Sequence, residues 1–315
     1  MTGFRTGFSI LRSAGVVVSL FLGACELDEV SLAQPENVLV AEVYVFMGDG
    51  ADQMTAFLHW TLGSDPTTNL VAASVQLTGE DGVPIDLVPE VRTACLVSEA
   101  AEKVEGTCFV APPLGEGVFD PGERVTVVIA LPDGRSLRGG TTLPGDFRFR
   151  APRVQGVCGL PPDTTLEVLW TQAEGTWAYA SETLIWGIRE AAGALGIEVD
   201  EDPLSLLGLS VSASDTTIVF PSEFGVFSRF DLDRELTLLL QKGLPLGTSA
   251  DVTVAALDRN YVNWIRGGNF NPSGQVRIPS LRGDGTGVLG SGVRRTFRAD
   301  GVAPGTPIPS CFWGL

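Results

Sequence analysis

The sequence predicts a mainly β protein with two β-sandwich-type domains. Apolar and polar residues alternate in several short segments, turn sequences separate these segments, and 315 residues are enough for two ordinary domains. We expect the first domain to span 37–145 and the second 150–315.

Alternation is clearest in the first predicted domain. Val75 and Leu77 stand between polar residues, and 125–131 follow the same two-residue period. The sequences at 79–82 and 131–134 are typical of tight turns, and Pro-Asp-Gly favours a hairpin. Short strands with closely spaced turns indicate an Ig-like sandwich.

The second predicted domain follows a break at 144–152, where 146–150 fits either a last strand or a linker. Leu166, Val168 and Trp170 alternate with other residues, and a further strand is expected around Tyr179. An inward Trp followed by a Tyr-bearing strand is similar to fibronectin-type sandwiches. Apolar alternation predicts two more strands, at 236–240 and 252–256.

We expect one or two short helices in this domain. Apolar spacing predicts a helix near 258–266, ended by Gly267 and Gly268. The Ala-rich segment 184–196 fits either a helix or a strand. The spacing near 258–266 rests on Leu257, Tyr261, Trp264 and Ile265.

The N-terminal segment resembles a lipoprotein signal peptide. Arg5 and Arg12 precede the apolar run 14–22, which is too short to span a bilayer, and small residues stand directly before Cys25. Cleavage would remove residues 1–24 and leave a thiol that can carry lipid such as palmitate, with 25–36 as a lipidated tether. The alternatives are an ordinary signal peptide and an N-terminal anchor helix. We expect a lipid-anchored protein of the cell envelope at the outer membrane. Glu26 follows the lipidated cysteine and leaves open inner- or outer-membrane retention and the face, periplasmic or surface, on which the protein lies.

Charge excludes some partners. The 21 Lys and Arg are outnumbered by 38 Asp and Glu, for a net charge of −17. A nucleic-acid-binding surface needs clustered basic residues, so we expect no nucleic acid partner. Membrane attachment is expected through the lipid and not through a basic face.

Four cysteines remain beside Cys25, an even number in a chain expected in an oxidising compartment. Three pairings are possible. We favour Cys95 with Cys108, which would close a short loop, and Cys158 with Cys311, which would tie the tail to the second domain. A zinc site is the competing use, but the spacings contain no CxxC and the chain has one His.

The order of features resembles bacterial envelope lipoproteins of the domain of unknown function 4249 family, whose first domain is Ig-like or carboxypeptidase-regulatory-like. The similar segments are 73–77 with 80–82, 125–131 with 133–134, and 261–264 followed by Pro279 and 285–290. The chain departs from the family at Leu289, in lacking an Asn before these glycines and in its four further cysteines. The resemblance implies no catalytic residues and an accessory role beside a TonB-dependent outer-membrane transporter.

Three further motifs suggest chemistry that we do not predict. Residues 285–290 satisfy GxGxxG, but no βαβ pattern surrounds them, so we expect a structural glycine-rich loop or bulge and no nucleotide.

His59 is the only His and should face outward from a strand if Leu58, Trp60 and Leu62 face the core.

Acidic segments leave a loose calcium site open. Residues 231–235 do not continue as an EF-hand loop, because Leu236 and Lys242 stand where Gly and Glu are needed. The remaining acidic groups are Asp49 with Asp52, and Asp200 with Glu201 and Asp202.

The sequence therefore predicts recognition and not turnover, with no cofactor, no metal and no catalytic residue assigned. We expect a lipid-anchored binding or accessory protein of the envelope, with a TonB-dependent transporter as partner. The alternatives are a structural envelope lipoprotein and a carboxylate-dependent hydrolase.

Overall fold

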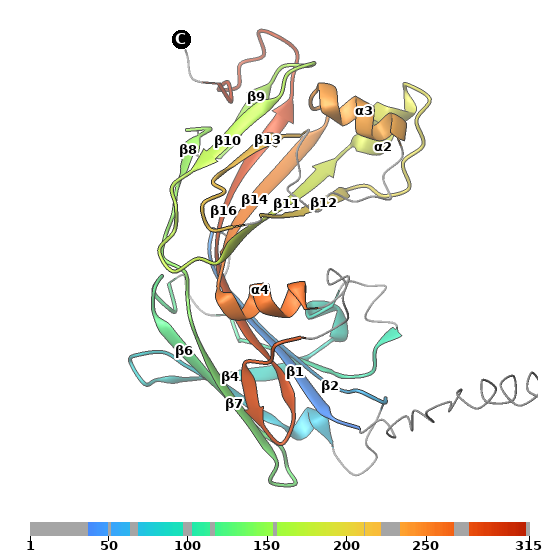
Figure 1. Cartoon of the computed structure of the whole chain (residues 1–315). Helices are drawn as coiled ribbons and strands as arrows, with labels where there is room; N and C mark the ends of the chain where they lie inside the picture. Colours follow the sequence, from blue (N-terminus) through green and yellow to red (C-terminus); the bar gives the residue numbers. More distant parts are fainter. Residues whose placement is uncertain are drawn as a thin grey trace, which may run out of the picture. The chain divides into compact units, whose positions relative to one another are not determined.

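The described part of the chain is mainly β with a few short helices, which confirms the predicted fold class (Figure 1). The computed structural model describes residues 37–49, 52–63, 69–96, 103–113, 117–153, 156–210, 212–221, 234–267 and 277–312. The predicted signal peptide, Cys25 and the tether lie outside these residues. No described helix has the length and apolar character that crossing a bilayer requires.

Seven strands form most of the first sandwich. Its two layers are linked through β4, which pairs with β5 in one sheet and with β3 in the other. The strands are β1 (Leu39–Gly48), β2 (Gln53–Trp60), β3 (Ser74–Thr78), β4 (Pro84–Glu90), β5 (Thr107–Val110), β6 (Arg124–Ala130) and β7 (Ser136–Thr142); two 3-10 turns are η2 (Leu70–Ala72) and η3 (Arg92–Ala94).

The predicted alternation builds the core of this sandwich. Val125, Val127 and Ile129 of β6 are buried while the residues between them are exposed. Val75 and Leu77 of β3 point to the same core. Each strand thus buries one face, as a two-residue period requires.

The second sandwich has a larger and a smaller layer. The larger contains β12, β11, β14 and β16 in that order, with β9 also paired to β16, and the smaller contains β13, β10 and β8. The strands are β8 (Phe149–Ala151), β9 (Val157–Leu160), β10 (Leu166–Trp170), β11 (Ala178–Trp186), β12 (Leu204–Leu209), β13 (Thr217–Phe220), β14 (Ser249–Leu257), β15 (Leu281–Gly283) and β16 (Thr286–Gly301). Segment 146–150 thus leads into the small edge strand β8.

Strand β16 belongs to both sandwiches. Residues 286–294 pair in parallel with β1, and 292–300 pair in antiparallel fashion with β14. The neighbouring strand β15 pairs with β7 of the first sandwich. Residues after 280 therefore contribute strands to sheets of both sandwiches.

Glycines of β16 allow close approach of the backbone. Gly287 has φ +146°, and a Cβ there would lie 1.9 Å from the carbonyl oxygen of Ala41. A Cβ on Gly290 would lie 2.9 Å from Cδ2 of Tyr261. The GxGxxG sequence from Gly287 onward therefore lies in the regular strand β16 and not in the loop or bulge expected from the sequence, because its glycines allow close pairing with β1. No helix follows it.

Three helices are described: α2 (Ile188–Gly193), α3 (Arg234–Lys242) and α4 (Arg259–Arg266). The predicted helix at 258–266 is confirmed; Asp258 caps it and Gly267 ends it, while Gly268 lies outside the described residues. Segment 184–196, for which the sequence allowed either a helix or a strand, contains both. Strand β11 continues to Trp186, and helix α2 begins at Ile188.

The predicted strand at 236–240 is wrong, because these residues lie in α3. Leu236 and Leu240 are buried four residues apart, whereas Leu238 between them is half exposed. Only one helical stripe packs on the core, and the local leucine alternation could not distinguish this stripe from a strand face.

Both favoured disulfide bonds are present. Cys95 pairs with Cys108 in the first sandwich, and Cys158 of β9 pairs with Cys311 near the end of the described chain. Their sequence separations are 13 and 153 residues.

We expect the longer loop to matter more for stability. Chain-entropy estimates give roughly 3 kcal/mol for closing a loop of about 13 residues and about 5 kcal/mol for one of about 153. Cys158→Ser with Cys311→Ser should therefore lower the free energy of unfolding more than Cys95→Ser with Cys108→Ser, as measured by denaturant titration. Equal losses would contradict this ranking.

Asp258 is a buried carboxylate that joins β7, β16 and α4. It accepts hydrogen bonds from the main-chain N–H of Tyr261 at 2.9 Å and of Ser291 at 3.1 Å, and from the hydroxyl of Thr141. Burial raises the pKa of this carboxyl, and the hydrogen bonds oppose the rise. The neighbouring Asn260 donates from its amide to the carbonyl oxygens of Gly140 and Leu289.

The raised pKa of Asp258 predicts a pH effect on stability. The folded state holds this proton more tightly than the unfolded state, so the contribution of Asp258 is greatest at low pH. It falls as pH rises from the ordinary Asp value through the folded-state pKa. Asp258→Asn should lack this decline. The free energy of unfolding of the variant, relative to that of the wild type, should therefore increase as pH rises from about 4. Parallel profiles in denaturant titrations across pH would contradict the assignment.

Candidate functional site

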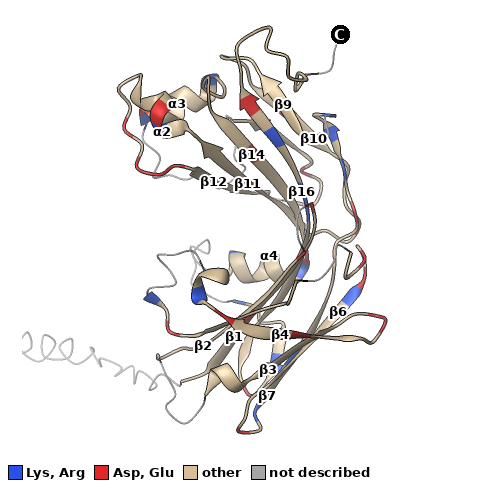
Figure 2. Cartoon of the chain, turned by 180° about the vertical axis from the view of Figure 1, so that it is seen from behind, with Lys and Arg blue, Asp and Glu red and all other residues tan. Residues whose placement is uncertain are grey.

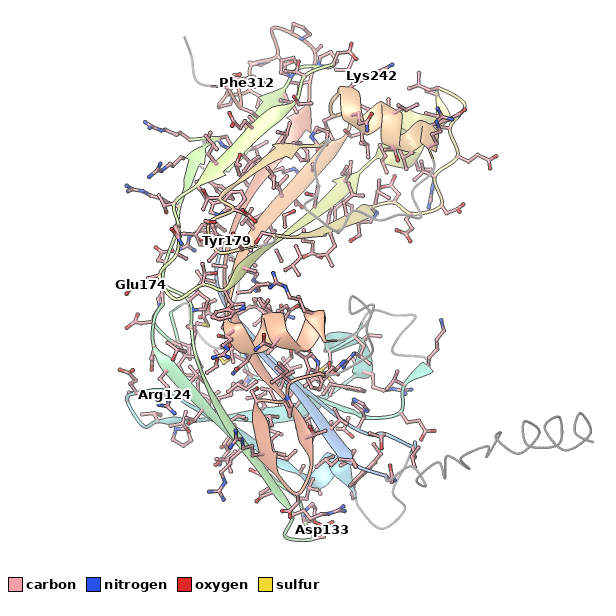
Figure 3. All side chains as sticks on the ribbon, viewed as in Figure 1. Arg124, Asp133, Glu174, Tyr179, Lys242 and Phe312 are labelled. Atoms are coloured by element: carbon pink, nitrogen blue, oxygen red, sulfur yellow. A yellow bond between two sulfur atoms is a disulfide. The ribbon has the colours of Figure 1, made fainter. Side chains whose placement is uncertain are left out.

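A cavity of about 320 Å³ lies in the second sandwich. Strands β10, β11, β12, β13 and β14 and the segment after β12 contribute to its walls. Tyr179, which is labelled in Figure 3, lies on β11 in the wall of this cavity. The described residues that line the cavity include Trp170, Tyr179, Ser181, Gly208, Ser210 and Asp215.

Small residues explain why this space exists. Ser181 pairs with Gly208 on β12 and with Val254 on β14, so these three residues share one face of the sheet. The next row on the same face contains Thr183 between two larger residues, Leu206 and Val252. Ser181 and Gly208 have smaller side chains than Thr183 and Leu206 in the next row, so they fill less of the space between this sheet and strands β10 and β13.

An aromatic pair forms one wall. The rings of Trp170 and Tyr179 lie edge to face with centroids 5.3 Å apart, and both side chains are buried. The Tyr179 hydroxyl accepts a hydrogen bond from the N–H of Ala173 at 2.7 Å. The Oγ of Ser210 accepts one from the N–H of Tyr179, also at 2.7 Å. These contacts hold the wall in place without a ligand.

The aromatic wall is uncharged at neutral pH. Burial raises the pKa of Tyr179, and the N–H of Ala173 and the indole of Trp170 oppose this rise. Although the indole lies close to the phenol, its buried Nε1 has no partner with hydrogen-bond geometry among the described residues.

Two residues with hydroxyl side chains face the same interior. Ser181 is 8% exposed and Thr183 is 2% exposed, and Ser181 lines the cavity. Together with the buried indole Nε1 of Trp170, the Ser181 hydroxyl makes the wall of the cavity partly polar. Polar groups in the buried phase of strands depart from a purely apolar core, so these positions favour a binding role.

Charged groups of both signs lie near Ser210. Asp215 lines the cavity, and its carboxylate accepts a hydrogen bond from the N–H of Ser212 at 3.0 Å. Arg266 of α4 donates to the carbonyl oxygen of Ser210 at 3.1 Å. The arrangement can bury an apolar molecule and offer it a hydroxyl and a carboxylate.

His59 lies apart from this cavity, on β2. Its side chain is 20% exposed, its ring stacks on Phe57, and its Nε2 lies 4.0 Å from the carboxylate of Glu42. Glu42 also accepts a hydrogen bond from Tyr44 at 3.0 Å and lies 3.4 Å from Arg277. The partly exposed position agrees with the prediction, but Leu62 is 52% exposed because β2 ends at Trp60.

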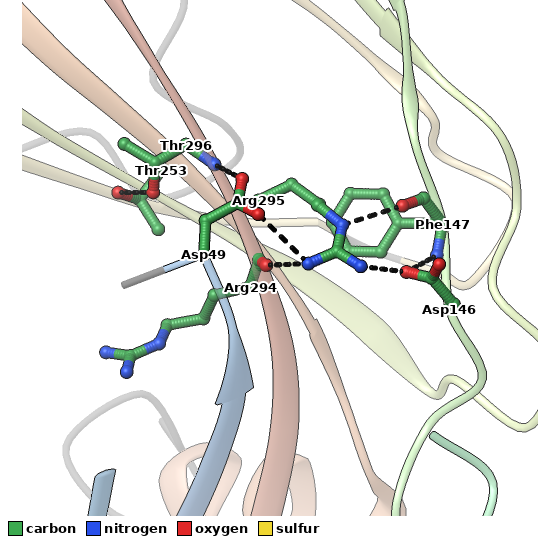
Figure 4. A network of polar contacts seen from close by, with 7 residues as sticks. All are labelled: Asp49, Asp146, Phe147, Thr253, Arg294, Arg295 and Thr296. Carbon is green, nitrogen blue, oxygen red and sulfur yellow. Dashed lines mark hydrogen bonds and ion pairs between the residues drawn. The ribbon is translucent and has the colours of Figure 1, made fainter. Parts of the chain in front are cut away.

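The acidic pair Asp49 and Asp52 does not form a shared ligand set. Figure 4 shows Asp49 occupied by Arg295 and by the N–H of Thr296, at 3.1 and 2.8 Å. Asp52 accepts from the N–H groups of Gly117 and Val118. These carboxylates therefore hold the chain in place.

Arg295 joins separate parts of the chain (Figure 4). Its guanidinium lies between Asp49, after β1, and Asp146, before β8, and its Nε donates to the carbonyl oxygen of Phe147 at 3.1 Å.

The other acidic segments give no metal centre in the described chain. Asp202 accepts hydrogen bonds from the N–H groups of Gly187 and Arg189, which fix the start of α2. Residues 231–233 of the former calcium-loop candidate lie outside the described residues. Among the residues that are described, no group of three or more His, Cys, Asp or Glu could hold a metal ion. Charged residues of both signs are scattered over strands and loops (Figure 2).

Sequence reasoning noted Trp170 and Tyr179 as a sandwich feature but missed the cavity. The available signal was the strand 178–186, where Ser181 and Thr183 take the inward positions between Tyr179 and Ile185. Hydroxyls in the buried phase of a strand mark a departure from a purely apolar core.

Comparisons with known proteins give only weak structural similarities. No protein-family model matches the chain, and no curated protein matches it. The fibronectin(III)-like modules of Clostridium thermocellum CbhA are similar at 9% identity, with 84% of this chain and 91% of that chain covered and a TM-score of 0.19.

The chain is also similar to Ig structures. Dpr11 IG1 bound to DIP-gamma IG+IG2 gives 8% identity, coverage of 85% and 100%, and a TM-score of 0.20. DIP-gamma IG1+IG2 gives 9% identity, coverage of 82% and 98%, and a TM-score of 0.20. Likeness at this level assigns no ligand or partner.

Proposed function

We propose that this protein is a lipid-anchored ligand-binding protein of the cell envelope, held to the outer membrane through Cys25. The observation that carries the binding function is the cavity beside Trp170 and Tyr179, with the Ser181 side chain and the buried indole Nε1 of Trp170, which has no partner among the described residues, in its wall. Recognition there uses burial of apolar surface and a small number of polar contacts.

The anchor rests on the sequence before the described chain. An apolar run behind two arginines ends in Leu-Gly-Ala-Cys, which supports cleavage before Cys25 and acylation of its thiol. Two disulfide bonds fit an oxidising compartment and so support export.

An accessory role beside a TonB-dependent transporter completes the proposal. This part rests on a resemblance to envelope lipoproteins of the domain of unknown function 4249 family. The similar segments are 73–77 with 80–82, 125–131 with 133–134, and 261–264 with Pro279 and 285–290. Such a protein would bind a ligand at the membrane surface and act together with the barrel.

The anchor and the partner are tested together in intact cells. The wild type should incorporate labelled palmitate and fractionate with membranes, whereas Cys25→Ala should do neither. Chemical cross-linking followed by capture in mild detergent and mass spectrometry should recover a transporter with the wild type and lose it with Cys25→Ala. Absence of palmitate label in the wild type would overturn the anchor, and recovery of no barrel would overturn the accessory role.

A further inference from the structure

The size of the cavity limits its occupant. An apolar cavity of roughly 150 Å³ can bind one benzene molecule. The cavity between β10, β11 and β13 measures about 320 Å³, about twice that volume. It therefore accommodates a compact molecule of about two fused rings.

The walls favour a flat apolar molecule. Trp170 and Tyr179 contribute aromatic surface, and Val254 and Ile218 contribute aliphatic surface. Both aromatic rings are fixed by packing against each other, and Tyr179 also packs against Phe147 at a centroid distance of 5.8 Å. A preformed apolar wall lowers the ordering cost of binding.

Ser181 supplies the polar contact. It lines the cavity and is 8% exposed. A hydroxyl can donate one hydrogen bond and accept others, so it suits a ligand hydroxyl, amine or carbonyl. A ligand group that reaches this hydroxyl gains one hydrogen bond in the wall of an otherwise apolar cavity.

The local charges disfavour an anion. Asp215 is the one ionisable acidic group among the described lining residues, and none of those residues is Lys or Arg. Arg266 lies near this end but donates to the carbonyl oxygen of Ser210. A ligand carboxylate would therefore lose its hydration without gaining a cationic partner in the described wall.

We propose that the cavity binds a neutral, apolar molecule of about two fused rings with one hydrogen-bonding group, and that Ser181 pairs with that group. The inference rests on the proposed ligand-binding function and names the ligand class. It does not depend on the lipid anchor or on a transporter.

The probe is 2-naphthol, titrated by calorimetry into the purified full chain in mild detergent. We expect saturable binding at one site. Ser181→Leu, which fills the cavity, should lower the affinity at least about tenfold. Ser181→Ala should lower it about two- to tenfold, the worth of one hydrogen bond. Thr183→Val is the matched control, since it removes a hydroxyl from the same strand face but does not line the cavity, and its affinity should match the wild type.

Two related probes separate the parts of the inference. Naphthalene lacks the hydroxyl, so it should bind the wild type more weakly than 2-naphthol does, and Ser181→Ala should abolish this difference. Sodium 2-naphthoate has the same rings with a carboxylate and should bind more weakly than 2-naphthol. Near-ultraviolet circular dichroism verifies that each variant remains folded.

Several outcomes overturn the inference. Equal 2-naphthol signals from the wild type and from folded Ser181→Leu would mean partition into detergent. Tighter binding of 2-naphthoate, abolished by Ser181→Leu, would refute the ligand class while leaving the binding function intact. No saturable binding of any of the three probes would refute both the ligand class and the cavity as the binding site, whereas the palmitate and cross-linking results would stand unaffected.

Discussion

The double pairing of β16 is the constraint on which the rest of the structure depends. Its first part pairs in parallel with β1 and its later part pairs with β14, so one continuous strand supplies hydrogen bonds to both sandwiches. Neither sandwich can complete its larger sheet without this strand. Because main-chain hydrogen bonds of a buried strand must be satisfied, a break in β16 would expose unpaired groups on both sides.

The glycines and Asp258 adapt the surroundings to this strand. Gly287 and Gly290 leave room for the backbone of Ala41 and the ring of Tyr261, contacts that a side chain would prevent. Asp258 then ties the start of α4 to Ser291 of the same strand and to Thr141 of β7. A buried carboxylate is costly to desolvate, and several hydrogen bonds are needed to offset that cost. The polar centre therefore fixes how α4 lies on the sheet.

The cavity of the second sandwich contrasts with this well-satisfied centre. Asp258 has partners for its oxygens, whereas the buried indole Nε1 of Trp170 in the cavity wall has none among the described residues. Loss of stability at such positions is a feature of binding sites, where polar groups are arranged for a ligand and not for the fold. The disulfide between Cys158 and Cys311 and the ring cluster around Tyr179 stabilise the same sandwich and offset that loss.

The sequence by itself determined the local features of this protein. Two-residue alternation identified strands such as β3, β6, β10 and β14, the apolar spacing near Trp264 identified α4, and the cysteine positions favoured the two bridges that form. The strands and the helix depend on residues a few positions apart in the sequence. The disulfide pairing was favoured from the number and the positions of the cysteines. Alternation failed at 236–240, because leucines two residues apart also fit one buried stripe and one exposed position of a helix. Only the tertiary structure decided that β16 serves both sandwiches and that Ser181 stands opposite Gly208 beside a cavity. Strand pairing and register join residues far apart in the chain, and such contacts leave no local period to read.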